Sequence, residues 1–266
     1  MYMIVRNKML CRDIMNIIEE TYPKHAAEDW DNVGLLVGRT GKDVKKIYIA
    51  LDATDEVIDA AIACGADMLL THHPMIFAPM KRITDEHFIG SRVVKLLQHD
   101  ISYYAMHTNY DVLSMADLSS KMIGLQNEEV LEVTNFELNQ GVGKVGDLQE
   151  QMTLEACCNL VKSKFELSAV RLFGDKNQSV KKAAICPGSG KHMIGYALQK
   201  GAEVLITGDI DHHEGIDALA QGLSIIDAGH YGLESIFIKD MEAYLEQYLE
   251  DVEIYTAELK NPFQMI

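Results

Sequence analysis

Hydrophobic and polar positions along this chain follow two alternating patterns. Short apolar runs such as IYIAL and MLLT have the length and composition of buried strands. Between these two runs, DEVIDAAIAC carries apolar residues at helical spacing, and Thr54 stands where a helix N-cap is expected. Strand, helix and strand in this order form the unit from which parallel sheets are built. The pattern therefore predicts an α/β fold.

The same pattern occurs twice. KKIYIALDATDEVIDAAIACGADMLLT (45–71) aligns without a gap with KKAAICPGSGKHMIGYALQKGAEVLIT (181–207), at an offset of 136 residues. In both copies a further helix and strand are predicted, over 87–98 and 101–106 in the first and over 214–222 and 223–227 in the second. Two copies are too few for a solenoid, which needs at least about three. An internal duplication that gives two related α/β domains is the better interpretation.

We place the first domain at residues 1–125 and the second at 126–266, with an approximate boundary. The segment 126–180 has no clear periodicity, and we expect it to be irregular and to belong to the second domain. The C-terminal KDMEAYLEQYLEDVEIYTAEL predicts a helix followed by a final strand.

Histidine and carboxylate side chains follow the predicted strands of both copies, at the sheet edge where parallel α/β folds bind ligands. The residues in question are His72, His73, His107, Asp111, Asp209, His212, His213, Asp227, His230 and Glu234. Each has an ordinary alternative: a lone histidine is usually a surface or hydrogen-bonded residue, and Asp111 or Glu234 could be a helix-start carboxylate. Their recurrence at matching strand ends of both copies favours a metal site.

The ligand types narrow the choice of metal. Imidazole nitrogen and carboxylate oxygen without thiolate suit Zn, Fe, Mn or Co better than Ca or Mg. His107 could relay a proton or orient a metal-bound water, or could make a structural hydrogen bond. His213 has similar alternatives. Trp30 lies in the loop AEDWDNVG, which either borders the site or places a tryptophan in the core.

Composition excludes several classes of protein. Lys and Arg total 24 against 40 Asp and Glu, so the formal charge of −16 disfavours nucleic-acid binding. The five cysteines show no CxxC spacing, which argues against a cysteine zinc cluster or a disulfide framework. The absence of a signal-like or membrane-spanning apolar stretch makes the cytoplasm the expected location, with no membrane partner. GVGKVG (141–146) matches a dinucleotide-binding pattern by letter, but no helix is predicted at its last glycine.

THHPMIF, HTNYD, TGDIDHHE, DAGHYGLE and AEDWDNVG together resemble the Nif-three-like family, whose members are often named GTP cyclohydrolase I type 2 homologues. The resemblance covers essentially the whole chain. It implies two α/β domains with a dinuclear metal site in the cleft between them, and a toroidal homohexamer. The implied ligands of the two divalent ions are His72, His73, Asp111, His230 and Glu234. Leu233 stands where the family more usually has threonine.

Two functions remain open at this point. The first is a metal-dependent hydrolase in which a metal-bridged hydroxide attacks an electrophilic carbon of a small-molecule substrate such as a nucleotide; for the family's named activity this means ring opening of GTP. His107 and His213 are its candidate catalytic residues. The second is a non-enzymatic metal-binding or regulatory hexameric ring that docks a partner protein.

Overall fold

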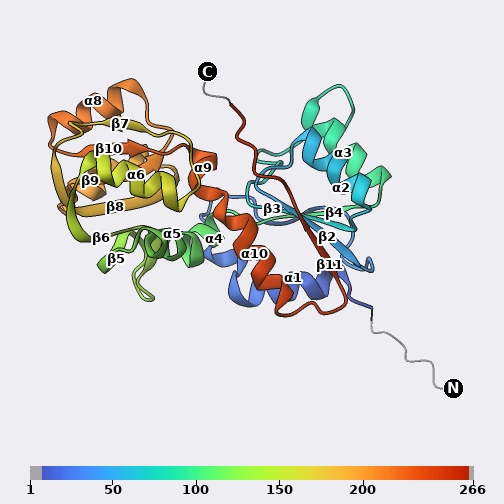
Figure 1. Cartoon of the computed structure of the whole chain (residues 1–266). Coiled ribbons are helices and arrows are strands. Elements are labelled where there is room, and N and C mark those ends of the chain that lie inside the picture. Colours follow the sequence, from blue (N-terminus) through green and yellow to red (C-terminus); the bar gives the residue numbers. More distant parts are fainter. Residues whose placement is uncertain (1–7, 264–266) are drawn as a thin grey trace. The chain divides into compact units, whose positions relative to one another are not determined.

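The structure, a computed structural model, describes residues 8–263 and divides the chain into two compact units (Figure 1). Unit 1 comprises the described residues up to Tyr110 together with Phe237–Leu259. Unit 2 comprises Asp111–Ile236 and the described residues from Lys260 onward. The sequence predicts two contiguous domains that meet near residue 125. In the structure, unit 2 begins earlier and the chain returns to unit 1 after it.

Unit 1 is built around a five-stranded sheet. Its strands are β1 (Gly34–Val37), β2 (Lys46–Ala50), β3 (Met68–Thr71), β4 (Ser102–Ala105) and β11 (Glu253–Thr256). Its helices are α1 (Cys11–Thr21), α2 (Asp55–Cys64), α3 (Phe88–Gln98), α4 (Thr108–Tyr110) and α10 (Ile236–Glu246), with a short 3-10 helix η1 (Lys24–Ala26). The strand order is β1-β4-β3-β2-β11, and only β1 runs antiparallel to its neighbour. The predicted C-terminal helix and strand are therefore present, but the strand completes the sheet of the first unit.

Local signals explain the helix between β2 and β3. The hydroxyl of Thr54 accepts a hydrogen bond from the backbone N–H of Val57 (3.2 Å), as an N-cap does. At the other end Gly65 adopts a left-handed conformation with φ +71°, which glycine reaches without steric strain. The apolar face of the helix is buried, and β3 is buried at every position. The predicted strand, helix and strand are confirmed here.

Unit 2 is built around a six-stranded sheet. Its strands are β5 (Gln126–Asn135), β6 (Gln140–Thr153), β7 (Arg171–Phe173), β8 (Ser179–Ser189), β9 (Val204–Gly208) and β10 (Ser224–Asp227). Its helices are α5 (Ala116–Ile123), α6 (Leu154–Lys164), α7 (Ile194–Gln199), α8 (His212–Ala220) and α9 (His230–Glu234), with a π-helical turn η2 (Asp111–Met115) and a 3-10 turn η3 (Lys191–Met193). The strand order is β5-β6-β8-β9-β10-β7. GVGKVG lies inside β6, so no helix opens at its last glycine.

The prediction that residues 126–180 are irregular is wrong. β5 and β6 form a long antiparallel hairpin, and α6 and β7 follow it. The hydrophobic pattern does not predict this hairpin because β5 is exposed over its first four residues and its last two, and so has no continuous apolar stripe. The predicted elements further along, β9, α8 and β10, are present.

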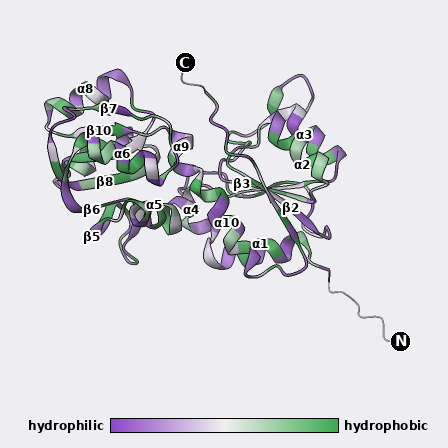
Figure 2. Cartoon of the chain, in the orientation of Figure 1, coloured by the Kyte–Doolittle hydropathy of each residue, from purple (hydrophilic) through white to green (hydrophobic). Residues whose placement is uncertain are grey.

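The unit 2 sheet carries buried hydrophobic side chains on both faces, supplied by alternate residues of the same strands. Ile206 and Ile226 belong to one buried cluster, and Leu205 and Ile225 to another, because successive side chains of a strand point to opposite faces. Figure 2 shows the corresponding concentration of hydrophobic residues on the central strands of both units. Within the described residues no helix is both long and apolar enough to cross a bilayer.

Strand pairing supports the internal duplication. In unit 1, Ile47 of β2 pairs with Met68 of β3, and in unit 2, Ala183 of β8 pairs with Val204 of β9. Both pairs are related by the 136-residue offset of the sequence repeat. In each unit an antiparallel edge strand, β1 or β7, precedes the repeat and pairs with the last of its parallel strands. The two α/β units therefore share one strand topology over the repeat.

Candidate metal centre

In unit 1, two histidines extend from the carboxyl end of β3. The backbone N–H of His73 donates to the carbonyl of Leu51 (2.9 Å), and its own carbonyl accepts hydrogen bonds from the hydroxyls of Thr71 (2.8 Å) and Tyr103 (3.0 Å). These bonds fix the backbone where it leaves the sheet. His72 is fully buried and packs against the ring of Phe237, with ring centroids 5.2 Å apart.

Two of the unit 1 histidines are oriented by carboxylates. Nδ1 of His73 is hydrogen-bonded to Oδ1 of Asp52 (2.8 Å), and Nδ1 of His107 to Oδ1 of Asp31 (2.9 Å). An ionised carboxylate can only accept, so each ring donates through Nδ1 and keeps Nε2 as its second nitrogen. This is the arrangement that usually surrounds a metal-binding histidine.

Asp31 is the more deeply embedded of the two carboxylates, with no exposed side-chain area. Its oxygens also accept hydrogen bonds from the backbone N–H (3.0 Å) and the hydroxyl (2.5 Å) of Thr108. Burial alone would raise the pKa of Asp31, but the hydrogen bonds from His107 and Thr108 outweigh it and lower the pKa to about 2. Asp31 is therefore ionised at neutral pH and holds His107 in one orientation.

His72, His73 and His107 come together in unit 1. Each offers one ring nitrogen such that the three atoms lie within 4.8 Å of one another. Two nitrogens bound to one ion at about 2.1 Å lie at most roughly 4.2 Å apart, so small side-chain rotations would bring this cluster onto a metal. These buried and half-buried histidines could hold a metal ion. His107 thus lies among predicted ligands, although the sequence assigned it a catalytic role.

In unit 2, the predicted ligands are contributed by η2 and α9. His230 and Glu234 are four residues apart on α9, so they share a helix face, and Nε2 of His230 lies 2.9 Å from Oε2 of Glu234. Two ligand atoms of one ion also lie roughly 3 Å apart. Nδ1 of His230 is hydrogen-bonded to Oδ2 of Asp209 (2.8 Å), the same carboxylate arrangement as in unit 1.

Asp111 and Glu234 both influence the pKa of the same buried thiol of unit 2, that of Cys186. Burial raises the pKa of Cys186, and the negative charges of Asp111 and Glu234 raise it further. Glu234 has only 5% of its side-chain area exposed, and Asp111, the first residue of η2, is half-buried. Two carboxylates in one largely desolvated region repel each other, which a bound cation would relieve.

The sequence makes room for Glu234 with a glycine. Gly188 adopts φ +80°, and a Cβ built on it would lie 2.5 Å from Oε1 of Glu234. In the 136-residue alignment Gly188 stands opposite Asp52, the carboxylate that orients His73 in unit 1. In the second copy a glycine therefore stands in place of the first copy's carboxylate, and it leaves space for the carboxylate of Glu234. The nitrogen and oxygen donor set and this space both fit a divalent ion.

Two other predicted positions have different surroundings. His213 is exposed near the start of α8 and its ring contacts that of His212, with centroids 5.2 Å apart. Among the described residues it belongs to none of the groups that could hold a metal. Trp30 is 59% exposed, so the alternative of a core tryptophan is wrong.

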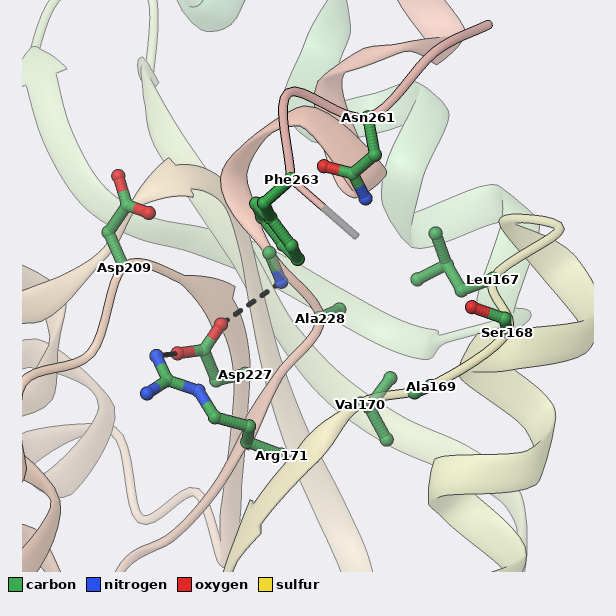
Figure 3. Close-up of a pocket in the computed structure, with 11 residues that line it drawn as sticks. Leu167, Ser168, Ala169, Val170, Arg171, Asp209, Asp227, Ala228, Asn261 and Phe263 are labelled. Carbon is green, nitrogen blue, oxygen red and sulfur yellow. Dashed lines mark hydrogen bonds and ion pairs between the residues drawn. The ribbon is translucent and has the colours of Figure 1, made fainter. Parts of the chain in front are cut away.

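A pocket of about 340 Å³ adjoins the unit 2 ligands. Figure 3 shows Phe263 and the aliphatic side chains of Leu167 and Val170 around it, with Arg171 paired to the buried Asp227 at one side. Asp209, which orients His230, also lines this pocket.

The orienting role of the carboxylates could not be predicted from the sequence. Asp52 lies two residues after the end of β2, and Asp209 directly follows β9, so both had the strand-end signal used for the histidines. Asp31 was noticed only as part of the AEDWDNVG loop. Their partners depend on side-chain direction, which spacing alone does not give.

Comparison with known proteins identifies the relatives of the chain. A family model described as Duf34/NIF3 (NGG1p interacting factor 3) matches residues 9–262. A Clostridium perfringens protein named GTP cyclohydrolase 1 type 2 homolog is 38% identical over 262 residues, covering 97% of this chain and 100% of that protein.

Solved structures agree with this match. The crystal structure of a Bacillus cereus protein related to NIF3 has a TM-score of 0.91 at 27% identity and covers 97% of this chain and 99% of that one. Reduced HcgD from Methanocaldococcus jannaschii has a TM-score of 0.81 at 32% identity, with coverage of 94% and 98%.

Proposed function

This chain belongs to the Duf34/NIF3 family, and we propose that it binds two divalent metal ions and is a metal-dependent hydrolase. The proposed ligands are His72 and His73, which belong to unit 1, and Asp111, His230 and Glu234, which belong to unit 2. Zn, Fe, Mn or Co are the ions that this nitrogen and oxygen donor set favours.

The observation that carries the proposal is the repeated histidine–carboxylate pair. His73, His107 and His230 each have Nδ1 on an aspartate and Nε2 as the remaining ring nitrogen. Such pairs fix the tautomer and raise the basicity of an imidazole, whether it binds a metal, as proposed for His73 and His230, or exchanges a proton, as proposed for His107. A single pair is common on protein surfaces, but three beside other predicted ligands support a metal-binding role.

The residues have separate tasks in this proposal. Glu234 and Asp111 supply negative charge that compensates the cations, and Asp209 and Asp52 hold the rings of His230 and His73 in place. Bound divalent ions would supply the Lewis acidity that hydrolysis needs.

His107 and His213 are proposed to carry protons during the reaction. In His107, Nδ1 is hydrogen-bonded to Asp31, so Nε2 is the nitrogen that would exchange a proton with substrate or water. His213 is exposed on α8 and so is free to exchange protons with solvent.

The substrate proposed is a small heterocycle or nucleotide. Relatives carry the name GTP cyclohydrolase 1 type 2 homolog, which makes GTP the first compound to try. A homohexamer in the cytoplasm is the proposed form of the protein.

Metal content tests the first part of the proposal. Purified wild-type protein is expected to contain close to two divalent ions per chain by elemental analysis, and Asp111→Ala and Glu234→Gln are expected to lose most of them. Glu137→Gln, at an exposed position in the β5–β6 turn, is the matched control and should retain the wild-type content. Wild-type content in both ligand variants would refute the assignment.

Turnover tests the second part. Metal-loaded protein is expected to consume GTP or another nitrogen heterocycle, and Glu234→Gln should abolish this. A protein that keeps its metals but turns over no heterocycle, nucleotide or phosphoester would instead support the non-enzymatic ring. Light scattering of the same sample tests the hexamer.

A further inference from the structure

We propose that Trp30 and Phe77 form a stacking platform for the planar ring of a heteroaromatic ligand, beside the histidine cluster of unit 1. The proposal deepens the proposed function, on which it rests, by naming the part of the substrate that the protein recognises. The platform is defined by these two side chains alone. It lies entirely within unit 1.

Both aromatic rings are exposed and close to His107. Trp30 is 59% exposed and Phe77 is 55% exposed, and their ring centroids are 5.7 Å apart at an interplanar angle of 42°. The ring of His107 lies 5.9 Å from Trp30 and 6.4 Å from Phe77, edge-on to each. His107 in turn belongs to the cluster with His72 and His73. The platform therefore borders the candidate metal ligands directly.

The residues next to each ring hold the platform in place. Asp31, which follows Trp30, is bonded to His107 and Thr108, and its backbone N–H donates to the carbonyl of Glu28 (2.9 Å). Asn32 donates from its side-chain amide to the carbonyl of Ile76 (2.5 Å), the residue before Phe77. The two loops are thus tied to each other and to the histidine. Rings held in position before binding lose little conformational freedom when a ligand arrives.

The chemistry of the platform favours a flat, unsaturated ligand. Trp30 and Phe77 already touch, so a ligand stacks on their outward faces rather than between them. Stacking on an aromatic face is available to any planar ring, including all nucleobases. An adjacent cluster of imidazole nitrogens suits polar groups at the edge of such a ring. An aliphatic ligand would contact the two aromatic rings but would offer no polar groups to the imidazole nitrogens.

The protein contains its own reporter, because Trp30 is its only tryptophan. Fluorescence of the full-length, metal-loaded protein, excited at the red edge of the tryptophan band, is titrated with guanosine, GTP, ribose and tripolyphosphate. We expect saturable quenching by guanosine and GTP, and none by ribose. Tripolyphosphate should leave Trp30 emission unchanged even if it binds the metals.

Variants separate stacking from general effects on the fold. Phe77→Ala keeps the reporter and is expected to weaken guanosine binding about 5- to 150-fold. Trp30→Ala, followed by equilibrium dialysis of labelled guanosine, should weaken it to a similar degree, and Trp30→Tyr should restore most of the affinity. Phe136→Ala removes an 86% exposed phenylalanine in the β5–β6 turn of unit 2 and should leave guanosine binding unchanged.

The outcomes are distinct from those that test the metal site. Wild-type affinity for guanosine in Phe77→Ala and Trp30→Ala, with metal content intact, would overturn the platform and leave the proposed function standing. Quenching by tripolyphosphate but not by guanosine would also overturn it. A blue-shifted Trp30 emission that no ligand alters, in a protein that light scattering shows to be oligomeric, would mean that a second copy covers the platform, and would refute the proposal.

Discussion

Replacement of Gly188 by alanine should remove metal from the protein although it leaves every proposed ligand residue unmutated. The new Cβ would lie 2.5 Å from Oε1 of Glu234, whereas ordinary contacts begin at 3.4 Å, so the carboxylate must retreat by about 0.9 Å. Metal–ligand distances tolerate only about ±0.2 Å. Glu234 is almost fully buried, so it has little room in which to move and keep its interactions. We expect a loss of metal affinity of about 10- to 100-fold, the range seen when the residue that holds a metal ligand in place is mutated.

Backbone strain must be separated from this clash. Gly188 has φ +80°, where a non-glycine residue costs about 1–3 kcal/mol in stability. Gly201, also in unit 2, is the matched control, because its φ is +71° and nothing lies within 4 Å of its built Cβ. Gly201→Ala should therefore be destabilised by a similar amount and keep its metals. The two variants are compared by thermal unfolding and by competition with a chromogenic chelator.

Two results would refute the reasoning. Wild-type metal affinity in Gly188→Ala would show that Glu234 does not need the space that the glycine leaves. Equal loss of metal in Gly188→Ala and Gly201→Ala would show that strain, rather than displacement of the carboxylate, is responsible.

Three further predictions concern carboxylates and thiols. The pKa of Asp31 is lowered from 3.8 to about 2, which corresponds to a stabilising contribution of about 2 kcal/mol. This contribution is complete above pH 3.8 and is lost as the pH falls through about 2. The free energies of unfolding of wild type and Asp31→Asn, measured in urea, should therefore converge over that pH window. Asp209→Ala should weaken metal binding about 10- to 100-fold by releasing His230, and wild-type affinity in a chelator competition would contradict this. Of the five cysteines only Cys64 is not buried, so one thiol should react with Ellman's reagent in native protein and the rest only after unfolding.

The sequence predicted the strand ends well because hydrophobic runs bounded by turns are a local signal. β3 and β10 end at the predicted residue, β4 and β9 end within one residue of it, and His72, His73 and His107 do lie together. The resemblance to a family supplied which of these side chains to regard as ligands. Whether the two sets of ligands share one pair of ions stays a prediction.

What the sequence missed depends on contacts between distant segments. β11 pairs in parallel with β2, some 200 residues earlier, and no local pattern distinguishes this from pairing within the second unit. The orienting role of Asp52 and Asp31 depends on which way a side chain points, not on spacing. The exposed position of Trp30 likewise follows from the hydrogen bonds of its neighbours.

The late return of the chain to unit 1 affects how the protein is synthesised. When a ribosome has released everything up to Ile236, unit 2 is nearly complete, while the sheet of unit 1 still lacks β11. Until that strand arrives, one edge of β2 has unpaired backbone groups, which other nascent chains could join. We therefore expect chaperone dependence to be concentrated in the first half of the chain, and premature stop codons between residue 236 and β11 to cause aggregation rather than a simple loss of activity.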